Sequence, residues 1–168
     1  VHVEPVQFFK HRPDNFPTIR LSQLANLYHK YQNLFSKIIN LKTVQEIYDL
    51  LLVPVAPYWQ NHYQFDKESS RKPKVLSHAF IDLLIINTII PLQFAYAATR
   101  DESIAEELIS FMNQVAPESN AIISKFEFFG VKAENAFETQ ALLELKKEYC
   151  NQKACLRCAL GIELLKNN

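Results

Sequence analysis

Three cysteines stand near the C-terminal end of this sequence, at Cys150, Cys155 and Cys158. Thiolates bind soft metal ions such as zinc, and the last two cysteines share one face if their segment is helical. The helix expected before Cys150 must reverse within a few residues, which would return the chain beside its own end. We therefore expect the three thiols to lie close enough together to share one site.

The number of ligands leaves several interpretations open. A closed zinc site or an iron–sulfur cluster takes four ligands, and the sequence supplies three cysteines. His62 is our first choice for a fourth ligand within the chain, and a cysteine outside this sequence is another. The alternatives are three reduced thiols that pack as small apolar residues, and a reversible disulfide. Zinc or an iron–sulfur cluster is thus the cofactor that the sequence could hold.

Two arginines, Arg12 and Arg20, flank a predicted helix start at which Pro13 and Pro17 bracket a turn. Free backbone N–H groups and the helix dipole attract anions at such a position. The arginines could therefore bind a phosphate, a carboxylate or a nucleic-acid backbone. The structural alternative is that they pair with acidic or carbonyl groups and hold the turn against the core. In either case we expect both arginines to reach the same groups or the same anion.

Aromatic side chains gather at residues 58–65, where Trp59 and His62 could stack on nucleic-acid bases. The alternative is that these side chains wedge the segment onto neighbouring helices. We expect Trp59 to be mostly buried, with Tyr58 or Tyr63 packed beside it, because an exposed tryptophan is uncommon.

The sequence contains no catalytic motif. Its two glycines, Gly130 and Gly161, cannot form a glycine-rich phosphate loop, and it has no HExxH segment and no nucleophile elbow. The 18 basic residues balance 18 acidic ones, so the chain has no net positive charge that would attract it to nucleic acid or to an anionic membrane. We predict no catalytic residue, and the question whether the chain is part of an enzyme stays open.

Helices must position these residues, because apolar residues recur at helical spacing and glycine is scarce. We predict an all-α fold: a single compact domain over residues 1–168, with roughly six to eight helices and no significant sheet. Residues 43–46 and 103–106 read as capping boxes. The predicted helices cover residues 18–31, 34–41, 43–53, 77–98, 103–115, 117–130, 135–149 and 156–165, with an extended lead-in at 3–9 and an exposed loop at 66–74.

The longest apolar run, residues 80–98, is interrupted by Asp82 and Asn87. A membrane span would tolerate a central aspartate poorly. We interpret the run as a helix that is buried on most sides and kinked at Pro91, in which Arg12 or Arg20 pairs with the aspartate.

Residues 12–24, 58–65, 86–91 and 149–161 together resemble the C-terminal part of a bacterial family known as domain of unknown function 2851. The family carries no established activity to transfer. Its members are longer, with a segment before this one, so the resemblance implies that the chain is a C-terminal piece whose partner is its own N-terminal segment. The resemblance and the odd number of cysteines both favour a cytoplasmic setting without a membrane.

Three functions remain in competition. The chain could be a helical accessory domain that packs on its N-terminal partner and contacts nucleic acid or protein. It could instead be part of a nuclease-like enzyme, in which the cysteines hold a structural zinc ion or an iron–sulfur cluster. The third possibility is a purely structural domain. Metal analysis of the purified protein would separate the second from the others.

Overall fold

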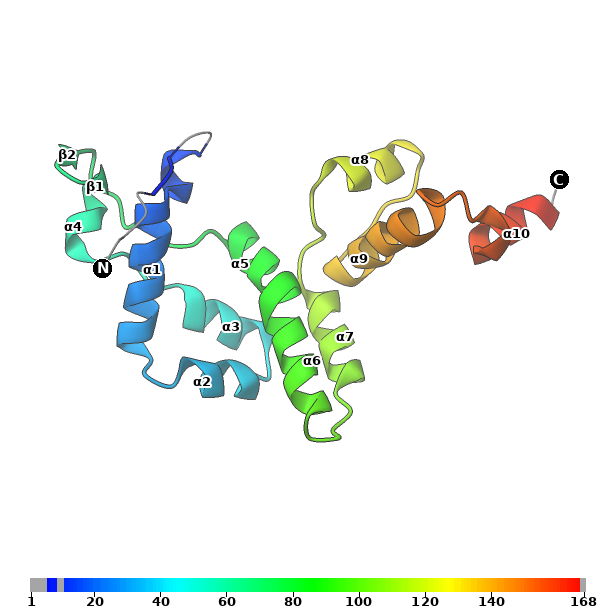
Figure 1. Ribbon diagram of the computed structural model, residues 1–168, viewed down its shortest axis with the longest axis horizontal. Helices are drawn as coiled ribbons and strands as arrows, with labels where there is room; N and C mark the ends of the chain where they lie inside the picture. Colours follow the sequence, from blue (N-terminus) through cyan, green and yellow to red (C-terminus); the bar gives the residue numbers. More distant parts are fainter. Residues whose placement is uncertain (1–5, 9–10, 167–168) are drawn as a thin grey trace. The chain divides into compact units, whose positions relative to one another are not determined.

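The computed structural model describes residues 6–8 and 11–166 (Figure 1). In this part of the chain helices make up nearly all of the regular structure, and the only sheet is a two-stranded hairpin. The prediction of an all-α fold without a significant sheet is confirmed. The expected lead-in at residues 3–9 lies largely outside the described residues.

The chain divides into two compact units, Val1–Tyr96 and Ala97–Asn168. The prediction of one domain over residues 1–168 stays a prediction. The first unit contains η1 (Pro13–Asn15), α1 (Pro17–Lys30), α2 (Leu34–Asn40), α3 (Val44–Leu51), α4 (Pro57–Gln60), β1 (His62–Gln64), β2 (Lys67–Glu68), α5 (His78–Leu84), η2 (Ile85–Ile89) and most of α6 (Ile90–Ala98). The second contains α7 (Ala105–Gln114), α8 (Ala121–Phe128), α9 (Ala136–Glu144), η3 (Leu145–Cys150), η4 (Cys155–Arg157) and α10 (Ala159–Lys166).

Helix α1 begins as expected, with Pro17 in its first turn. Proline suits this position because its missing N–H would have no partner there and its φ angle is already helical. The 3₁₀ turn η1 comes just before, and it too starts on a proline, Pro13. The buried hydroxyl of Thr18 donates a hydrogen bond of 2.6 Å to the carbonyl of Tyr63, which ties the start of α1 to the hairpin.

The predicted capping box at the start of α3 is confirmed. The side chain of Thr43 accepts a hydrogen bond from the N–H of Glu46, and the carboxylate of Glu46 accepts one from the N–H of Thr43. These bonds satisfy N–H groups that have no partner within the helix. The N–H of Lys42 also donates to the Glu46 carboxylate. The bonds from Lys42, the larger contribution, and from Thr43 lower the pKa of that carboxyl.

A short hairpin follows α4, and its strands β1 and β2 pair antiparallel. Asp66 at its turn has φ +57°, a left-handed conformation that aspartate tolerates better than most residues. The segment after the hairpin is hydrogen-bonded to the end of α4. The N–H of Ser69 donates to the carbonyl of Asn61 at 2.7 Å, and the N–H of Lys72 donates to that of Gln60 at 2.8 Å. The expected exposed loop is therefore anchored to the end of α4.

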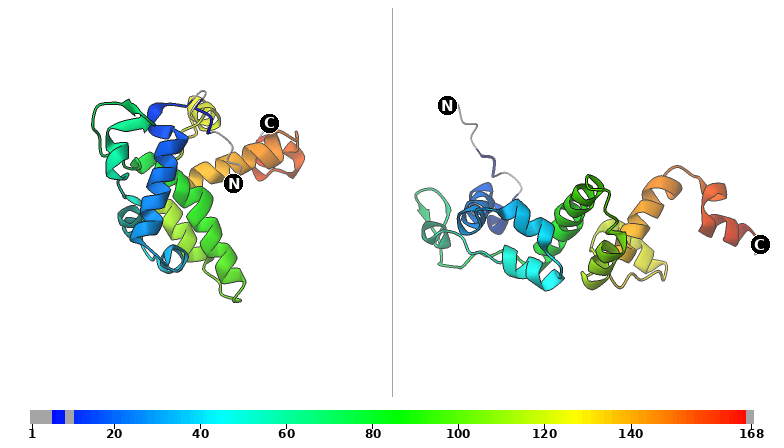
Figure 2. Two further views of the ribbon diagram at one scale, coloured as in Figure 1. Left: turned by 60° about the vertical axis from the view of Figure 1, so that its left-hand side comes forward. Right: turned by 90° about the horizontal axis from the view of Figure 1, so that it is seen from below.

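The stretch His78–Ala98 is one continuous helix, in which α6 follows directly on α5 in Figures 1 and 2. It widens into the π turn η2 just before Pro91. The wider turn accommodates a residue that lacks an N–H. By length and composition alone, it is the one helix in the described chain that could cross a membrane, and 28% of its apolar window is buried. The expectation of burial on most sides is wrong, because one face carries the core residues Ile81 and Ile85 while Phe94 is exposed.

The predicted partners of Asp82 are also wrong. Its carboxylate accepts a hydrogen bond from the hydroxyl of Tyr48 on α3, whereas Arg20 bonds elsewhere. Asn87 is exposed and donates to the carbonyl of Leu83, one turn earlier. These polar residues are thus satisfied by neutral groups, and no buried ion pair is needed to explain them.

In the second unit the predicted capping box at residues 103–106 is wrong. The N-cap of α7 is Ile104, whose side chain cannot accept a hydrogen bond. The helix predicted from residue 117 begins later, at a cap in which Asn120 accepts from two N–H groups. Gly130 follows α8 with φ +84°, as expected for the residue that ends a helix. The core of this unit includes Thr139, which is fully buried.

Candidate functional site

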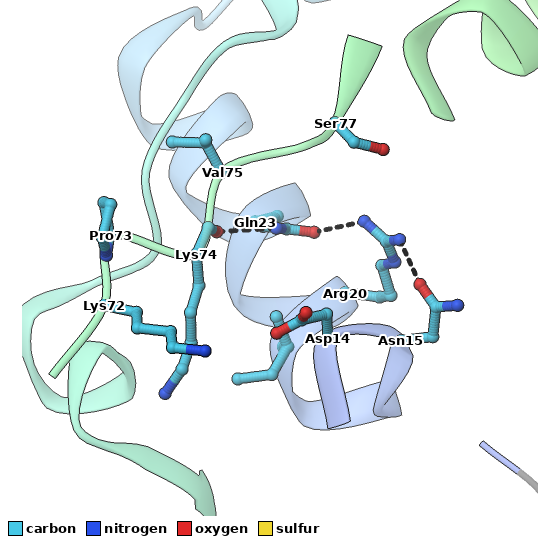
Figure 3. Close-up of a pocket in the computed structure, with 10 residues that line it drawn as sticks. Asp14, Asn15, Arg20, Gln23, Lys72, Pro73, Lys74, Val75 and Ser77 are labelled. Carbon is cyan, nitrogen blue, oxygen red and sulfur yellow. Dashed lines mark hydrogen bonds between the residues drawn. The ribbon is translucent and has the colours of Figure 1, made fainter. Parts of the chain in front are cut away.

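A cavity of about 350 Å³ lies in the first unit, between η1, the first turns of α1 and the segment that follows the hairpin (Figure 3). Four charged side chains line it, and we call it the cationic pocket: Asp14, Arg20, Lys72 and Lys74. Three of the four are cations, so the lining has an excess of two positive charges. Of the predicted anion-binding residues, only Arg20 lines this pocket.

Lys74 is the unusual residue of the cationic pocket. The residue is only 7% exposed, although lysine is almost never buried without a partner of opposite charge. Its ammonium group donates to the carbonyls of Trp59 at 2.6 Å and of His62 at 2.8 Å, and lies 3.8 Å from the ring centroid of Tyr63. Its φ of +46° is also rare for lysine. The fold thus holds the Lys74 amine in place at a cost in folding free energy.

The charge of Lys74 is only partly compensated. Within the described residues no carboxylate forms an ion pair with it. Burial lowers the pKa of its amine below the ordinary value, the negative charge of Asp14 opposes this shift, and the positive charge of Lys72 adds to it. A second anion beside the amine would therefore stabilise its charged form.

Arg20 stands at the other end of the pocket. Its guanidinium donates to the side-chain oxygens of Gln23, at 3.0 Å, and of Asn15, and it covers the ring of Phe80 at 3.8 Å. Gln23 is buried, and its amide donates to the carbonyl of Lys74 at 2.8 Å. It therefore links Arg20 to the backbone of Lys74. Neutral partners thus orient the arginine. Burial lowers the pKa of its guanidinium, and the negative charge of Asp14 opposes this shift, so its charge is compensated only in part.

Asp14 supplies the one negative charge of the lining and lies between the lysines and Arg20 in Figure 3. Its carboxylate accepts a hydrogen bond of 2.9 Å from the hydroxyl of Tyr63. Burial raises the pKa of Tyr63, and the hydrogen bond to Asp14 raises it further, so the phenol stays protonated and remains a donor. Asp14 is therefore held by a neutral partner and moderates the positive field of the pocket.

Arg12 does not join Arg20. It is exposed and precedes η1, and its carbonyl accepts the N–H of Asn15 at 2.8 Å. Its side chain does not line the pocket. Among the described residues Arg20 bonds to the side chains of Gln23 and Asn15, and no side-chain bond of Arg12 to these groups is seen, while a shared anion stays a prediction.

Trp59 and His62 contribute to the pocket through their backbones. The ring of His62 is buried and stacks on Tyr58 with centroids 4.0 Å apart, and its Nδ1 lies 2.9 Å from the Tyr58 carbonyl. Trp59 is half-buried between Tyr58 and Phe65, with each pair of centroids 5.0 Å apart. The predicted packing of Tyr58 beside Trp59 is confirmed, while the burial of Trp59 is less than expected. Neither residue lines the pocket, but the carbonyls of both hold the amine of Lys74.

Sequence reasoning missed Lys72 and Lys74, which lie in the run interpreted as an exposed loop. A lysine in a polar segment gives no sign of burial, since the carbonyls that bind Lys74 belong to residues 12 and 15 positions earlier. The helix start at Pro17 was a usable signal for Arg20. It carried no information about the segment that closes the pocket.

The cysteines do not form the expected cluster. Cys150 and Cys155 are exposed, Cys158 is buried, and all three are free thiols. In the part of the chain that the structure describes, no three side chains of histidine, cysteine, aspartate or glutamate are grouped so that they could hold a metal ion. The zinc or iron–sulfur site thus has no geometric support here and stays a prediction.

Comparisons with known proteins place the chain without assigning an activity. No curated protein and no solved structure matches it. Residues 1–121 match the sequence model of a family described as "protein of unknown function (DUF2851)", and this match includes the whole of the cationic pocket. Since the match covers well over half of the 168 residues, the chain belongs to the DUF2851 family.

Proposed function

We propose that this chain is an accessory domain that binds a phosphate group of nucleic acid in the cationic pocket. The observation that carries the proposal is Lys74, a buried amine held by two carbonyls with no ion-pair partner in the described chain. Burying a charge in this way is costly unless a ligand or partner shares the site. The family match, which assigns no activity, leaves this proposal open to experiment.

A phosphate suits the pocket in charge and in size. Its oxygens accept hydrogen bonds from ammonium groups, which Lys72 and Lys74 supply on one side of Asp14, while Arg20 adds positive charge on the other side. Small-molecule sites usually enclose ~300–1,000 Å³, so a cavity of about 350 Å³ suits one charged group better than a large cofactor. Asp14 would oppose an anion, and we expect the phosphate to approach on the side of Lys72, away from this carboxylate.

Binding through one pocket should be weak and sensitive to salt. The chain has no net charge, so no long-range field attracts a polyanion to it. Each phosphate that a cation neutralises releases counterions, and the affinity falls with salt in proportion to the number of such contacts. We therefore propose that the pocket positions a nucleic acid that other parts of a larger protein also hold. A cytoplasmic setting and an N-terminal partner segment fit this role.

The test is fluorescence anisotropy with a labelled single-stranded oligonucleotide at several salt concentrations. Lys72→Ala removes an exposed cation of the pocket, so it should weaken binding to all sequences alike and reduce the salt slope by about one. The matched control is Lys42→Ala, an exposed lysine that does not line the pocket, which should bind like the parent. Equal loss in both variants, or no loss in either, would refute the proposal.

A further inference from the structure

A second cavity, of about 250 Å³, adjoins the cationic pocket. Its apolar and aromatic wall is formed by Pro13, Phe16 and Tyr63. The polar and charged residues Gln64, Lys67 and Glu68 of the hairpin, and Ser69 just after it, complete the lining. We call it the aromatic pocket. The rings of Phe16 and Tyr63 meet edge to face with centroids 6.1 Å apart, so the wall is a fixed surface and not a pair of loose side chains.

The two pockets share a wall. The turn η1 contributes Pro13 to the aromatic pocket and Asp14 to the cationic one. Tyr63 lines the aromatic pocket, while its hydroxyl bonds to Asp14 and its ring is covered by the ammonium of Lys74. One ligand with a charged group and a neighbouring flat group could therefore occupy both.

Ser69 adds an observation that points to a ligand. Its hydroxyl oxygen is buried and has no hydrogen-bond partner in the described chain, and the residue lines the aromatic pocket. Buried polar atoms are nearly always paired, because leaving one unpaired costs free energy. Because Ser69 lines the cavity, the polar edge of a ligand bound there could supply the missing partner. The amide of Gln64 offers a further donor and acceptor beside it.

We propose that the aromatic pocket takes one unpaired base of the nucleic acid whose phosphate binds in the cationic pocket. This inference rests on the proposed function and deepens it, because it names single-stranded nucleic acid as the ligand. A base has a flat apolar face for the aromatic wall and a polar edge for Ser69 and Gln64. In a duplex the bases are stacked and paired, so a duplex would offer the protein its phosphates alone.

The experiment compares three labelled ligands on the full chain: a short oligothymidylate, an abasic oligonucleotide of the same length, and a duplex. Stacking of one base on an aromatic side chain is worth enough to predict roughly fivefold tighter binding, or more, for oligothymidylate than for the abasic strand. Phe16→Leu and Ser69→Ala should each reduce this advantage and leave the binding of the abasic strand unchanged. The control is Phe65→Leu, which alters an exposed aromatic residue of the same hairpin outside the pocket.

The outcomes separate the two proposals. If the abasic strand binds as well as oligothymidylate and Lys72→Ala weakens both, the phosphate site stands and the base site is overturned. If none of the ligands responds to Lys72→Ala, both fall. A base-dependent affinity that survives Phe16→Leu and Ser69→Ala would place the base elsewhere and overturn the inference. The ligand comparison on the parent chain needs no variant, so it holds even if Phe16→Leu fails to fold.

Discussion

The two units of the chain bury different kinds of residue. Among the described residues, the first unit buries six polar or charged side chains and the second buries one, Thr139. Both units leave large apolar side chains exposed, and the most exposed of those described are Phe128, Phe129 and Leu156 in the second unit. Buried polar groups fix geometry because each one demands a partner in a set direction. The buried polar groups therefore fix the geometry of the first unit, and the described residues of the second unit show no comparable set.

The family match extends past the boundary between the units. It covers the whole of the first unit and the start of the second, and it ends at Ala121, the first residue of α8. The residues that hold the cationic pocket all fall within it, and the three cysteines all fall outside it. This supports the pocket as the feature to test first.

The largest expected effect is the loss of stability when the buried amine of Lys74 is removed. Lys74→Ala would leave the carbonyls of Trp59 and His62 without their donor and should destabilise the protein by roughly 2–4 kcal/mol, measured by urea unfolding. Lys74→Gly should cost about 1 kcal/mol less, because glycine accepts the φ of +46° that strains alanine. Lys72→Ala, at an exposed neighbour, should change stability by less than ~0.5 kcal/mol. If Lys74→Ala is as mild as Lys72→Ala, the polar core of the first unit is less tightly held than its contacts indicate.

A matched pair of helix caps compares the two units directly. Thr43→Ala removes a side-chain oxygen that accepts the N–H of Glu46 and should cost about 1 kcal/mol. Ser103→Ala alters the same sequence pattern in the second unit, where the helix is capped by Ile104 without a side-chain bond, and should change stability by less than ~0.5 kcal/mol. Thermal unfolding of both variants checks the pair. Equal losses would mean that the cap at Ser103 forms in solution.

The pair also shows what sequence could predict. Both patterns have a hydroxyl residue with glutamate three positions later, and local chemistry alone does not distinguish them. In the second unit the cap falls on Ile104, and the first turns of α7 bury Leu108 and Phe111. Since the two local patterns are alike, we infer that packing of these side chains, which is not a local property of the sequence, decides where the helix starts. The all-α fold was predictable because apolar spacing is repeated many times along the chain.

The site was predictable only in part, for the same reason. Arg20 was found because its type and its place at a helix start carry a known chemistry. Lys74 was missed because its burial depends on carbonyls of α4 and β1 and on a backbone conformation that lysine rarely adopts. The cysteine cluster was predicted from spacing, yet spacing does not determine which way side chains point after a turn. Residues 145–150 form a π turn that sequence gave no reason to expect.

A smaller effect should appear at alkaline pH. Burial raises the pKa of Tyr48 to about 12, helped by its hydrogen bond to Asp82 and the charge of that carboxylate. The folded protein therefore keeps a proton between pH 10 and 12 that the unfolded chain loses, so stability should fall as the pH rises through this range. Unfolding by urea at several pH values would measure this slope. Tyr48→Phe has no proton to lose and should show a smaller decline; an unchanged slope would assign the effect to other groups.

The smallest expected effect is on the reaction rates of the thiols in the second unit with a chromogenic reagent. It involves no change in the stability of the protein. Cys150 and Cys155 are exposed and should react at once in the native protein, while the buried Cys158 should react slowly until denaturant is added. Cys158→Ala should remove the slow phase alone. Three equally fast thiols would show that the C-terminal segment opens easily. Three protected thiols, together with zinc or iron retained after dialysis against a chelator, would instead restore the shared metal site and give the second unit a specific role of its own.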